Sequence, residues 1–341
     1  MAATSFQNTD VDKIKARLGP KLDQYFPECG KNLPTLHLAT VSHRSYSDLY
    51  LFRTSLNGGG GSRGLAVKVF LPASGGQDAA RLQFAALNSV WPAFRTSKTM
   101  TIPQPLDYFP ELSAIVTERV QGRPLQQLFK TVALMPEQKA GLARLTEQSG
   151  QWLRKFHAAT SLPPGRLHLD GKLESLRANL DLLQTFGFSV DLCRQVATCL
   201  NSLAKDIRNL ELGMASVHGD FTVDNVLFDG KRIITIDLGG RDRNAVYHDI
   251  ATFLNSLALI GLTWPLRRRS LVERCSRGFL WGYFGAADFS RSAVSFLRLA
   301  GLVSVVLEIL ERRSDQLLLV RWWIRPYLDR LCRQMIKDAN G

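Results

Sequence analysis

The sequence of 341 residues has few cysteines and no spacing that would put them to use. Its cysteines lie far apart and include no Cys-x-x-Cys pair, which argues against a zinc site and against a disulfide framework. The N-terminus also lacks a charged segment followed by an apolar core, so no secretory signal is visible. We therefore expect a cytoplasmic protein whose five cysteines stay reduced, namely Cys29, Cys193, Cys199, Cys275 and Cys332.

Long apolar runs are also scarce. The uncharged stretch Ile250–Leu266 precedes the basic triplet Arg267–Arg269, the flank expected on the cytoplasmic side of a membrane span. It is at the lower limit of length for crossing a bilayer, however, and Asn255 and Pro265 weaken it further. We interpret it as a buried helix, and the second run, Leu299–Leu310, is too short to span.

Acidic residues are fewer than basic ones, 30 against 43, which gives a net charge of +13 and a sequence pI of about 9.8. Such a surface attracts phosphates, anionic lipid headgroups or nucleic acid more readily than cationic ligands. With 45% hydrophobic and 21% charged residues, the chain can bury a substantial core, as one large domain or two lobes.

The region from Thr35 to Arg119 has a strand-like pattern. Its apolar runs are short and rich in β-branched or aromatic residues, which predicts a small antiparallel sheet. The glycine-rich stretch Asn57–Gly64 lacks the lysine and hydroxyl residue of a phosphate-binding P-loop, so we interpret it as a hairpin turn. A helix is expected from Asp78, as N-cap, to about Pro92. The predicted strands lie within residues 36–41, 48–56, 64–71 and 113–120.

From Pro124 onward the pattern is mostly helical, with long amphipathic segments. One stretch breaks it: "NVLFD" and "RIITID" flank the turn Gly230-Lys231 and predict a small hairpin among the helices. The fold class is therefore α+β. We expect a helical N-terminal extension over residues 1–34, a small antiparallel-sheet lobe over 35–120 and a mostly helical lobe over 121–341.

Three polar side chains surround this hairpin. Asp220 lies in the loop before its first strand, Asn225 near the start of that strand, and Asp237 at the end of the second strand. An amide oxygen and a carboxylate suit a hard divalent cation that also holds phosphates, so Asn225 and Asp237 are candidate Mg²⁺ ligands. Asp220 can then accept a proton from a hydroxyl group, as phosphoryl transfer requires.

The segments "HGDFTVDN" and "IITIDLGG" resemble the catalytic loop and metal-binding segment of the aminoglycoside phosphotransferase and choline kinase-like family, which has a protein-kinase-like bilobal fold. The order of other features agrees with this over roughly Thr35 to Phe284. "GLAVKVF" resembles the lysine-bearing third strand, "IVTERVQGRPL" the hinge, "WLRKFHAAT" the helix before the catalytic loop, and "YHDIATFL" the later Asp-Leu-Ala segment.

This resemblance implies an ATP- and Mg²⁺-dependent kinase with Asp220 as the catalytic base. It implies that Lys68 grips the α and β phosphates and that the loop between the first two strands covers them, although this loop departs from protein kinases by holding serines, Ser45 and Ser47 among them, where those have glycines. Backbone groups from Glu118 to Val120 would meet the adenine. His218 and Asp249 would support the catalytic loop, with Asp249 as the buried aspartate that braces it; Asp249 could also cap the helix that it opens.

The chain departs from the family pattern at one charged position. The helix after Lys68 normally offers a glutamate to the lysine, and here Gln83 occupies the nearest place. A neutral amide accepts a hydrogen bond from the ammonium but supplies no opposing charge, so the grip on phosphate would be weaker. This departure keeps a pseudokinase, a nucleotide-binding or regulatory module, open as the alternative function.

The acceptor side of the chain is rich in arginine. "PLRRRSLVERCSRGF" and "RWWIRPYLDRLCRQMIK" favour a neutral or anionic acceptor, such as a sugar, a nucleoside or a lipid-linked glycan. The second segment also has the composition of an interfacial helix, which would give peripheral contact with an anionic membrane, or of a terminal helix packed on its lobe. A nucleic-acid or membrane-surface binder is a third function class, although no specific nucleic-acid motif is present.

Overall fold

A computed structural model of the chain describes residues 8–29, 34–55, 63–132, 139–239, 243–263, 269–313 and 324–340. Most of the glycine-rich turn, the arginines Arg267 and Arg268, and Arg321–Trp323 of the C-terminal segment lie outside these ranges. The chain divides into two compact units. The first comprises residues 1–97 and 101–121, and the second comprises residues 98–100 and 122–341.

The first unit contains a five-stranded antiparallel sheet in the order β1-β2-β3-β6-β5. All four strands predicted from the sequence are present. The sequence pattern missed the edge strand β5, because its segment "PLDYF" contains a proline and an aspartate, both depleted in strands. The strands are β1 (Thr35–His43), β2 (Ser47–Ser55), β3 (Gly64–Phe70), β5 (Pro105–Phe109) and β6 (Ala114–Glu118).

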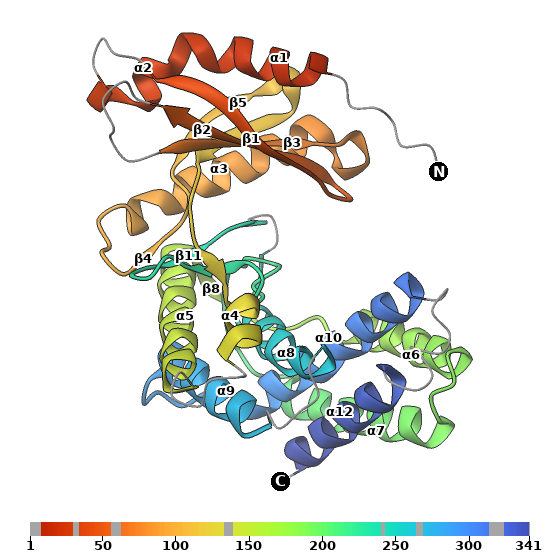
Figure 1. Ribbon diagram of the computed structural model, residues 1–341. Coiled ribbons are helices and arrows are strands. Elements are labelled where there is room, and N and C mark those ends of the chain that lie inside the picture. The colour runs from red at the N-terminus through yellow and green to blue at the C-terminus, as the bar shows by residue number, and fades with distance from the viewer. Residues whose placement is uncertain are drawn as a thin grey trace. The chain divides into compact units, whose positions relative to one another are not determined.

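Helices cover both faces of this sheet (Figure 1). The N-terminal helices α1 (Asn8–Leu18) and α2 (Leu22–Tyr25) bury Leu18 and Phe26 in one core with Phe52 of β2. The helix α3 (Gly76–Phe94) covers the other face. It starts after Gly75, which has a left-handed φ of 87°, rather than at the expected cap Asp78.

The second unit is mostly helical, and it contains two small sheets of order β4-β11-β10-β7 and β12-β9-β8. The antiparallel sheet of the first unit and the helices of the second confirm the predicted α+β fold class. The helices are α4 (Leu125–Val132), α5 (Lys139–Ala159), α6 (Asp170–Thr185), α7 (Val190–Ile207), α8 (Tyr247–Thr263), α9 (Arg269–Phe284), α10 (Arg291–Arg312) and α12 (Arg325–Asn340).

The hairpin predicted within the helical half is present. Strands β10 (Val226–Phe228) and β11 (Ile233–Thr235) pair antiparallel, with Leu227 opposite Ile234. The short strand β7 (Arg123–Pro124) pairs with the other side of β10. Strand β4 (Met100–Thr101) adjoins β11, where the amide of Ile233 donates to the carbonyl of Thr99. The remaining strands are β8 (Ser161–Gly165), β9 (Leu212–Ser216) and β12 (Arg243–Ala245).

The apolar helices of the second unit are largely internal. Most of the predicted buried run lies in α8, whose Ile250 and Phe253 are fully buried. Helix α10 is longer than its apolar run suggested; by length and composition alone it could cross a membrane, but most of it is buried. Helix α12 buries Leu328 and Cys332, so its apolar face packs within the unit while Arg330, Arg333 and Lys337 face solvent.

Helices α5 and α9 lie side by side in unusually close contact. A Cβ atom added at Gly150 of α5 would collide with the carbonyl oxygen of Phe279, and one added at Gly282 of α9 would collide with that of Glu147. Only glycine permits this approach of two backbones. In contrast, a Cβ at Gly141, also on α5, would meet no atom within 4 Å.

We therefore expect the same substitution to have opposite effects at two places in one helix. Gly150→Ala should destabilise the protein by about 1–3 kcal/mol, because the helices must separate. Gly141→Ala should be neutral or should stabilise it by up to about 1 kcal/mol through helix propensity. Urea denaturation measures both, and equal effects of the two variants would contradict the close contact.

Candidate active site

A buried carboxylate fixes the loop that carries Asp220. Asp249, near the start of α8, is fully buried, and its Oδ2 accepts hydrogen bonds from the amide of His218 at 2.7 Å and from Nε2 of His157 at 2.9 Å. Its Oδ1 accepts from the amide of Gly219 at 2.9 Å. Burial alone would raise the pKa of Asp249, but these hydrogen bonds and the nearby histidines lower it, so the carboxylate is charged.

The side chain of His218 ties this loop to the metal-binding segment. His218 is fully buried, and its Nε2 lies 3.1 Å from the carbonyl oxygen of Ile236, which can only accept a hydrogen bond. Its Nδ1 can therefore accept the amide hydrogen of Asp220, at 3.4 Å. Burial lowers the pKa of His218, so the ring is neutral and acts as a spacer between two loops rather than as an acid or base.

Aromatic side chains surround the hydrogen bonds of Asp249. The hydroxyl of Tyr283 on α9 lies 2.8 Å from Nδ1 of His157 on α5, so both nitrogens of that ring have partners. Trp152 stacks on Phe221, the residue after Asp220, with ring centroids 5.5 Å apart. This apolar surround excludes water from the hydrogen bonds of Asp249, which strengthens them.

Asn225 and Asp220 are directly bonded. The Nδ2 of Asn225 donates to a carboxylate oxygen of Asp220 at 2.8 Å and to its backbone carbonyl at 2.9 Å. The Oδ1 of Asn225 accepts no hydrogen bond from the residues that the structure describes. The contact thus orients the carboxylate of Asp220 and leaves an amide oxygen on Asn225 to act as a ligand.

Asp237 has a left-handed backbone, with a φ of 59°. Such a conformation costs a residue other than glycine about 1 kcal/mol or more, and it persists only where neighbours enforce it. Here the amide of Ile236 donates to the carbonyl of Asn225, and the amide of Gly239 donates to that of His218, both at 3.0 Å. These bonds hold Asp237 between the two loops.

Partial burial raises the pKa of Asp220 above its ordinary value. The hydrogen bond from Asn225 opposes this effect, and the negative charges of Asp237, Asp224 and Glu308 add to it. Asp220 remains accessible to solvent, so it has the two properties that a general base needs, access to the substrate and increased proton affinity.

The residues present fit a magnesium ion. Among the described residues no group of three or more His, Cys, Asp or Glu side chains could hold a metal ion by itself. Magnesium often uses only one or two protein oxygens together with substrate phosphates, which matches Oδ1 of Asn225 and the carboxylate of Asp237. The carboxylates that raise the pKa of Asp220 also concentrate negative charge at this place, and a bound cation would offset that charge.

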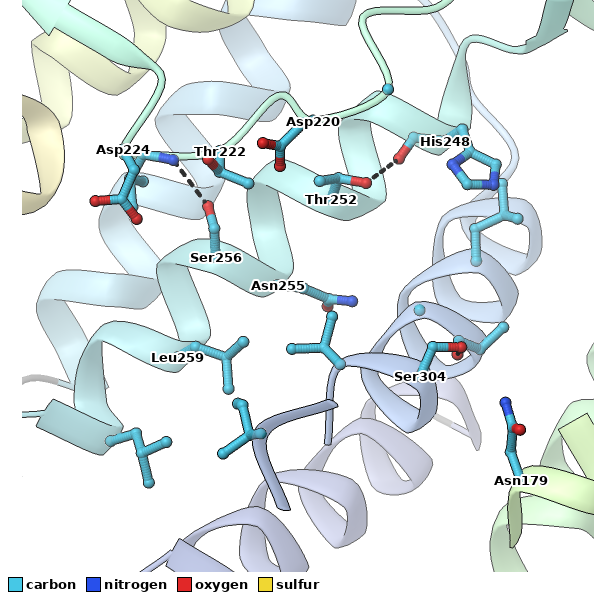
Figure 2. Close-up of a pocket in the computed structure, with 18 of the residues that line it drawn as sticks. Asn179, Asp220, Thr222, Asp224, His248, Thr252, Asn255, Ser256, Leu259 and Ser304 are labelled. Carbon is cyan, nitrogen blue, oxygen red and sulfur yellow. Dashed lines mark hydrogen bonds between the residues drawn. The ribbon is translucent and has the colours of Figure 1, made fainter. Parts of the chain in front are cut away.

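A cavity of about 760 Å³ opens beside Asp220 within the second unit. Figure 2 shows Asp220, Thr222 and Asp224 along one side of it, and His248, Thr252, Ser256 and Leu259 following α8. Helices α6 and α10 complete the wall. The loop is attached to α8 a second time, since the amide of Val223 donates to Oγ of Ser256 at 3.1 Å.

The other predicted site residues lie in the first unit. Lys68 is on β3, opposite Leu49 of β2, and its Nζ lies 5.0 Å from the ring centroid of Phe70. Ser45 is exposed in the β1–β2 turn, whereas Ser47 is buried at the start of β2. Gln83 is buried in α3.

The predicted hinge has few unused backbone donors. The amide of Glu118 donates to Gln104 at 2.9 Å, and that of Arg119 donates to Gly64 at 2.8 Å. The amide of Val120 makes no such bond to another described residue, so it is the better candidate to meet a nucleotide base.

The pocket residues outside the loop were not found from the sequence. Lys172 and Asn179 on α6, Asn255 on α8 and Ser304 on α10 are single polar residues in amphipathic helices. No local motif distinguishes them from surface residues of the same helices. The only available signal was the two polar residues Asn255 and Ser256 inside an otherwise apolar run.

The fold and the loop geometry define a kinase-like phosphotransferase. A family profile described as the phosphotransferase enzyme family matches residues 43–283, more than two thirds of the chain. The chain belongs to this family. The predicted resemblance and the predicted class, a phosphotransferase with an alcohol group as acceptor, are thereby confirmed.

Solved structures similar to this chain have the same fold. A glucosamine kinase is 14% identical with a TM-score of 0.55, and the match covers 89% of this chain and 94% of that one. The aminoglycoside 2′-phosphotransferase-IIIa in its GDP complex is 16% identical with a TM-score of 0.55, over 97% and 99%. A choline/ethanolamine kinase family protein from Mesorhizobium loti is 16% identical with a TM-score of 0.51, over 95% of each chain. Comparison with curated proteins found no match.

The role of Asp249 predicts a large and pH-dependent effect on stability. Asp249→Ala should cost about 3–5 kcal/mol at pH 7, because it leaves His157 and two amides without their buried partner. Since the folded pKa of Asp249 is lowered, its contribution is complete above its unfolded value of about 4 and is lost as pH falls through the folded pKa. The difference between wild type and variant should therefore shrink in acid.

Denaturant unfolding at a series of pH values measures this effect. Asp170→Ala is the matched control, because Asp170 is exposed and its one ion pair among the described residues is with Arg208 at the surface, so its loss should cost less than about 1 kcal/mol. A variant Asp249→Ala as stable as Asp170→Ala would show that the buried carboxylate does not hold the loop.

Proposed function

We propose that the protein is an ATP- and Mg²⁺-dependent kinase that transfers the γ-phosphoryl group to a hydroxyl of a neutral or anionic small molecule. The observation that carries the proposal is the bonded pair of Asp220 and Asn225 at a cavity of about 760 Å³, with Asp237 held beside them in a strained conformation. A purely structural loop would have no need to keep this negative charge at the edge of a cavity.

Asp220 acts as the base in this proposal. Its carboxylate, oriented by Nδ2 of Asn225, accepts a hydrogen bond from the acceptor hydroxyl and takes its proton as that oxygen bonds to the γ-phosphorus and the bond from the γ-phosphorus to ADP breaks. The raised pKa favours this transfer at neutral pH. Asp249 and His218 do not touch the substrate; they keep the loop from moving, which preserves the orientation of the base.

Asn225 and Asp237 would hold magnesium through an amide oxygen and a carboxylate oxygen. When bound, the ion neutralises charge on the transferred phosphoryl group. The residues of the two loops would then have separate functions, with Asn225 and Asp237 serving the phosphates and Asp220 serving the hydroxyl. For the nucleotide, we propose that Lys68 binds phosphate oxygens, that Ser45 and Ser47 belong to the covering loop, and that Glu118 and Val120 border the adenine site.

The cavity lining favours a neutral or anionic acceptor. Asp220 and Asp224 are its only carboxylates among the described residues, and both lie on the catalytic loop, whereas Lys172 and Arg313 line its helical wall. A polycationic acceptor would meet no acidic wall there. One similar structure contains glucosamine, ADP and inorganic phosphate, which supports a small hydroxylated acceptor in a protein of this fold.

A pseudokinase is the second candidate, and Gln83 is the observation that favours it. Gln83 is buried in α3 at the position nearest to that of the family glutamate, and it brings no negative charge. Nucleotide binding without turnover on any hydroxyl acceptor would support this alternative. All five cysteines are free, as in a reducing compartment, so we propose a cytoplasmic location for either function. The exposed basic residues of α12 allow peripheral contact with anionic membranes.

The central test removes the base without changing its shape. Asp220→Asn should lower kcat for ATP-dependent phosphorylation by about 10²–10⁴-fold and should leave nucleotide binding unchanged, because only the proton acceptor is lost. Turnover is measured as ADP release with Mg²⁺ and a panel of hydroxyl acceptors. Asp191→Asn, an exposed site on α7, is the control. Turnover by Asp220→Asn within tenfold of wild type would remove Asp220 as the base.

A second test concerns the nucleotide. Lys68→Met should raise the KM for ATP by about tenfold or more, because a charge-assisted contact with phosphate is lost while the strand keeps its apolar packing. Lys15→Met, an exposed site on α1, should leave the KM unchanged. An unchanged KM for Lys68→Met would assign Lys68 to a structural role.

A further inference from the structure

One end of the acceptor cavity contains two basic side chains in contact. Lys172 on α6 and His248 on α8 both line the cavity and are half-buried, and the Nζ of Lys172 lies 3.3 Å from Nε2 of His248. Because the ammonium group can only donate, this nitrogen of His248 is the acceptor in the contact. Lys172 keeps further N–H donors for another partner.

No carboxylate of the described residues forms an ion pair with Lys172. Among the described residues, its one polar partner is His248, and burial by itself lowers the pKa of Lys172, with no acidic group opposing the shift. A half-buried ammonium group without a counter-ion carries a desolvation cost that a structural role would not explain. Both residues also lie in the first turns of their helices, where the backbone adds positive rather than negative potential.

The basic pair lies close to the proposed base. Asp249, the residue after His248, accepts a hydrogen bond from the amide of Gly219, the residue before Asp220. Figure 2 accordingly shows His248, Thr252 and Asp220 along the same part of the pocket. A ligand hydroxyl at Asp220 and an anionic group at Lys172 would therefore belong to one small molecule.

The rest of the cavity lining is mixed, with apolar side chains from α8 and α10 beside single polar residues such as Asn255 and Ser304. From His248 the lining follows α8 through Thr252 to Leu259 and Ile260, a distance of about 18 Å along the helix axis. Helix α10 faces this stretch with Leu297, Val305 and Ile309. A fully hydrophilic ligand would leave these side chains uncovered, whereas an apolar portion would bury them.

We propose that the acceptor is an amphiphile in which a hydroxyl group lies close to an anionic group, a carboxylate or phosphate, that Lys172 binds. Its apolar portion lies between α8 and α10. This inference rests on the proposed function, because it assigns the hydroxyl to Asp220. It adds a substrate class and a specificity-determining residue, Lys172, which forms no part of the catalytic loop.

Matched ligands that differ in one group test this inference by binding alone. We would titrate the full chain with 3-hydroxyoctanoate, with its neutral amide and with the cationic 1-amino-3-octanol, and would follow equilibrium binding by calorimetry or ligand-detected NMR. The carboxylate should bind at least about tenfold more tightly than the other two. A fourth ligand, 3-hydroxyoctyl phosphate, shows which anion is preferred, and tighter binding of either anion supports the proposal.

Lys172→Gln should reduce the preference for the anion to about twofold, and Lys172→Arg should restore most of it. Lys205→Gln, an exposed site on α7, should change nothing. The proposal is overturned if the amide or the amine binds as well as the acids, if none of the four ligands binds, or if Lys172→Gln keeps the preference. Anion binding without phosphorylation would refute the kinase function but would support the anion site at Lys172. Turnover restricted to neutral or cationic acceptors would support the kinase function and refute the anion site.

Discussion

The structure of the catalytic loop depends on one buried carboxylate. The cost of burying the charge of Asp249 is offset because His157 and the amides of His218 and Gly219 donate hydrogen bonds to both of its oxygens. Through those two amides, Asp249 sets the direction in which the chain leaves the core toward Asp220. The direction of the loop therefore decides where Asp220, the proposed base, lies. The side chains that set this position, those of Asp249 and His157, are buried and do not line the cavity.

Local sequence patterns were sufficient for the elements that meet at this loop. The β-branched strands and the turn residues between them predicted the hairpin that Asp220, Asn225 and Asp237 flank, because strand pairing leaves few choices for a two-residue turn. The four central strands of the sheet followed from the same reasoning. Strand β5 did not, since its proline and aspartate conceal a strand that only its pairing with β6 maintains.

The residues that line the cavity could not be predicted from local sequence patterns. The cavity wall combines residues from α6, α8 and α10, which together span more than one hundred positions in sequence, and their convergence depends on how the helices pack. Lys172 has the local pattern of an ordinary surface lysine, and only its burial beside His248 distinguishes it. Likewise, the left-handed backbone of Asp237 results from tertiary hydrogen bonds, and an aspartate gives no local reason to expect it.

Helix α8 contributes to both the loop of Asp220 and the cavity beside it through two consecutive residues. Asp249 accepts hydrogen bonds from the loop, and His248 lines the cavity. Among the described residues, α6 and α10 provide none of the hydrogen bonds that hold the amides of His218, Gly219 and Val223, although Glu308 of α10 helps to raise the pKa of Asp220. Substitutions at the cavity residues of α6 and α10 would therefore change the cavity lining while leaving these hydrogen bonds of the loop in place. In an evolving lineage, new acceptors would be acquired through α6 and α10, and α8 would be the element that changes least.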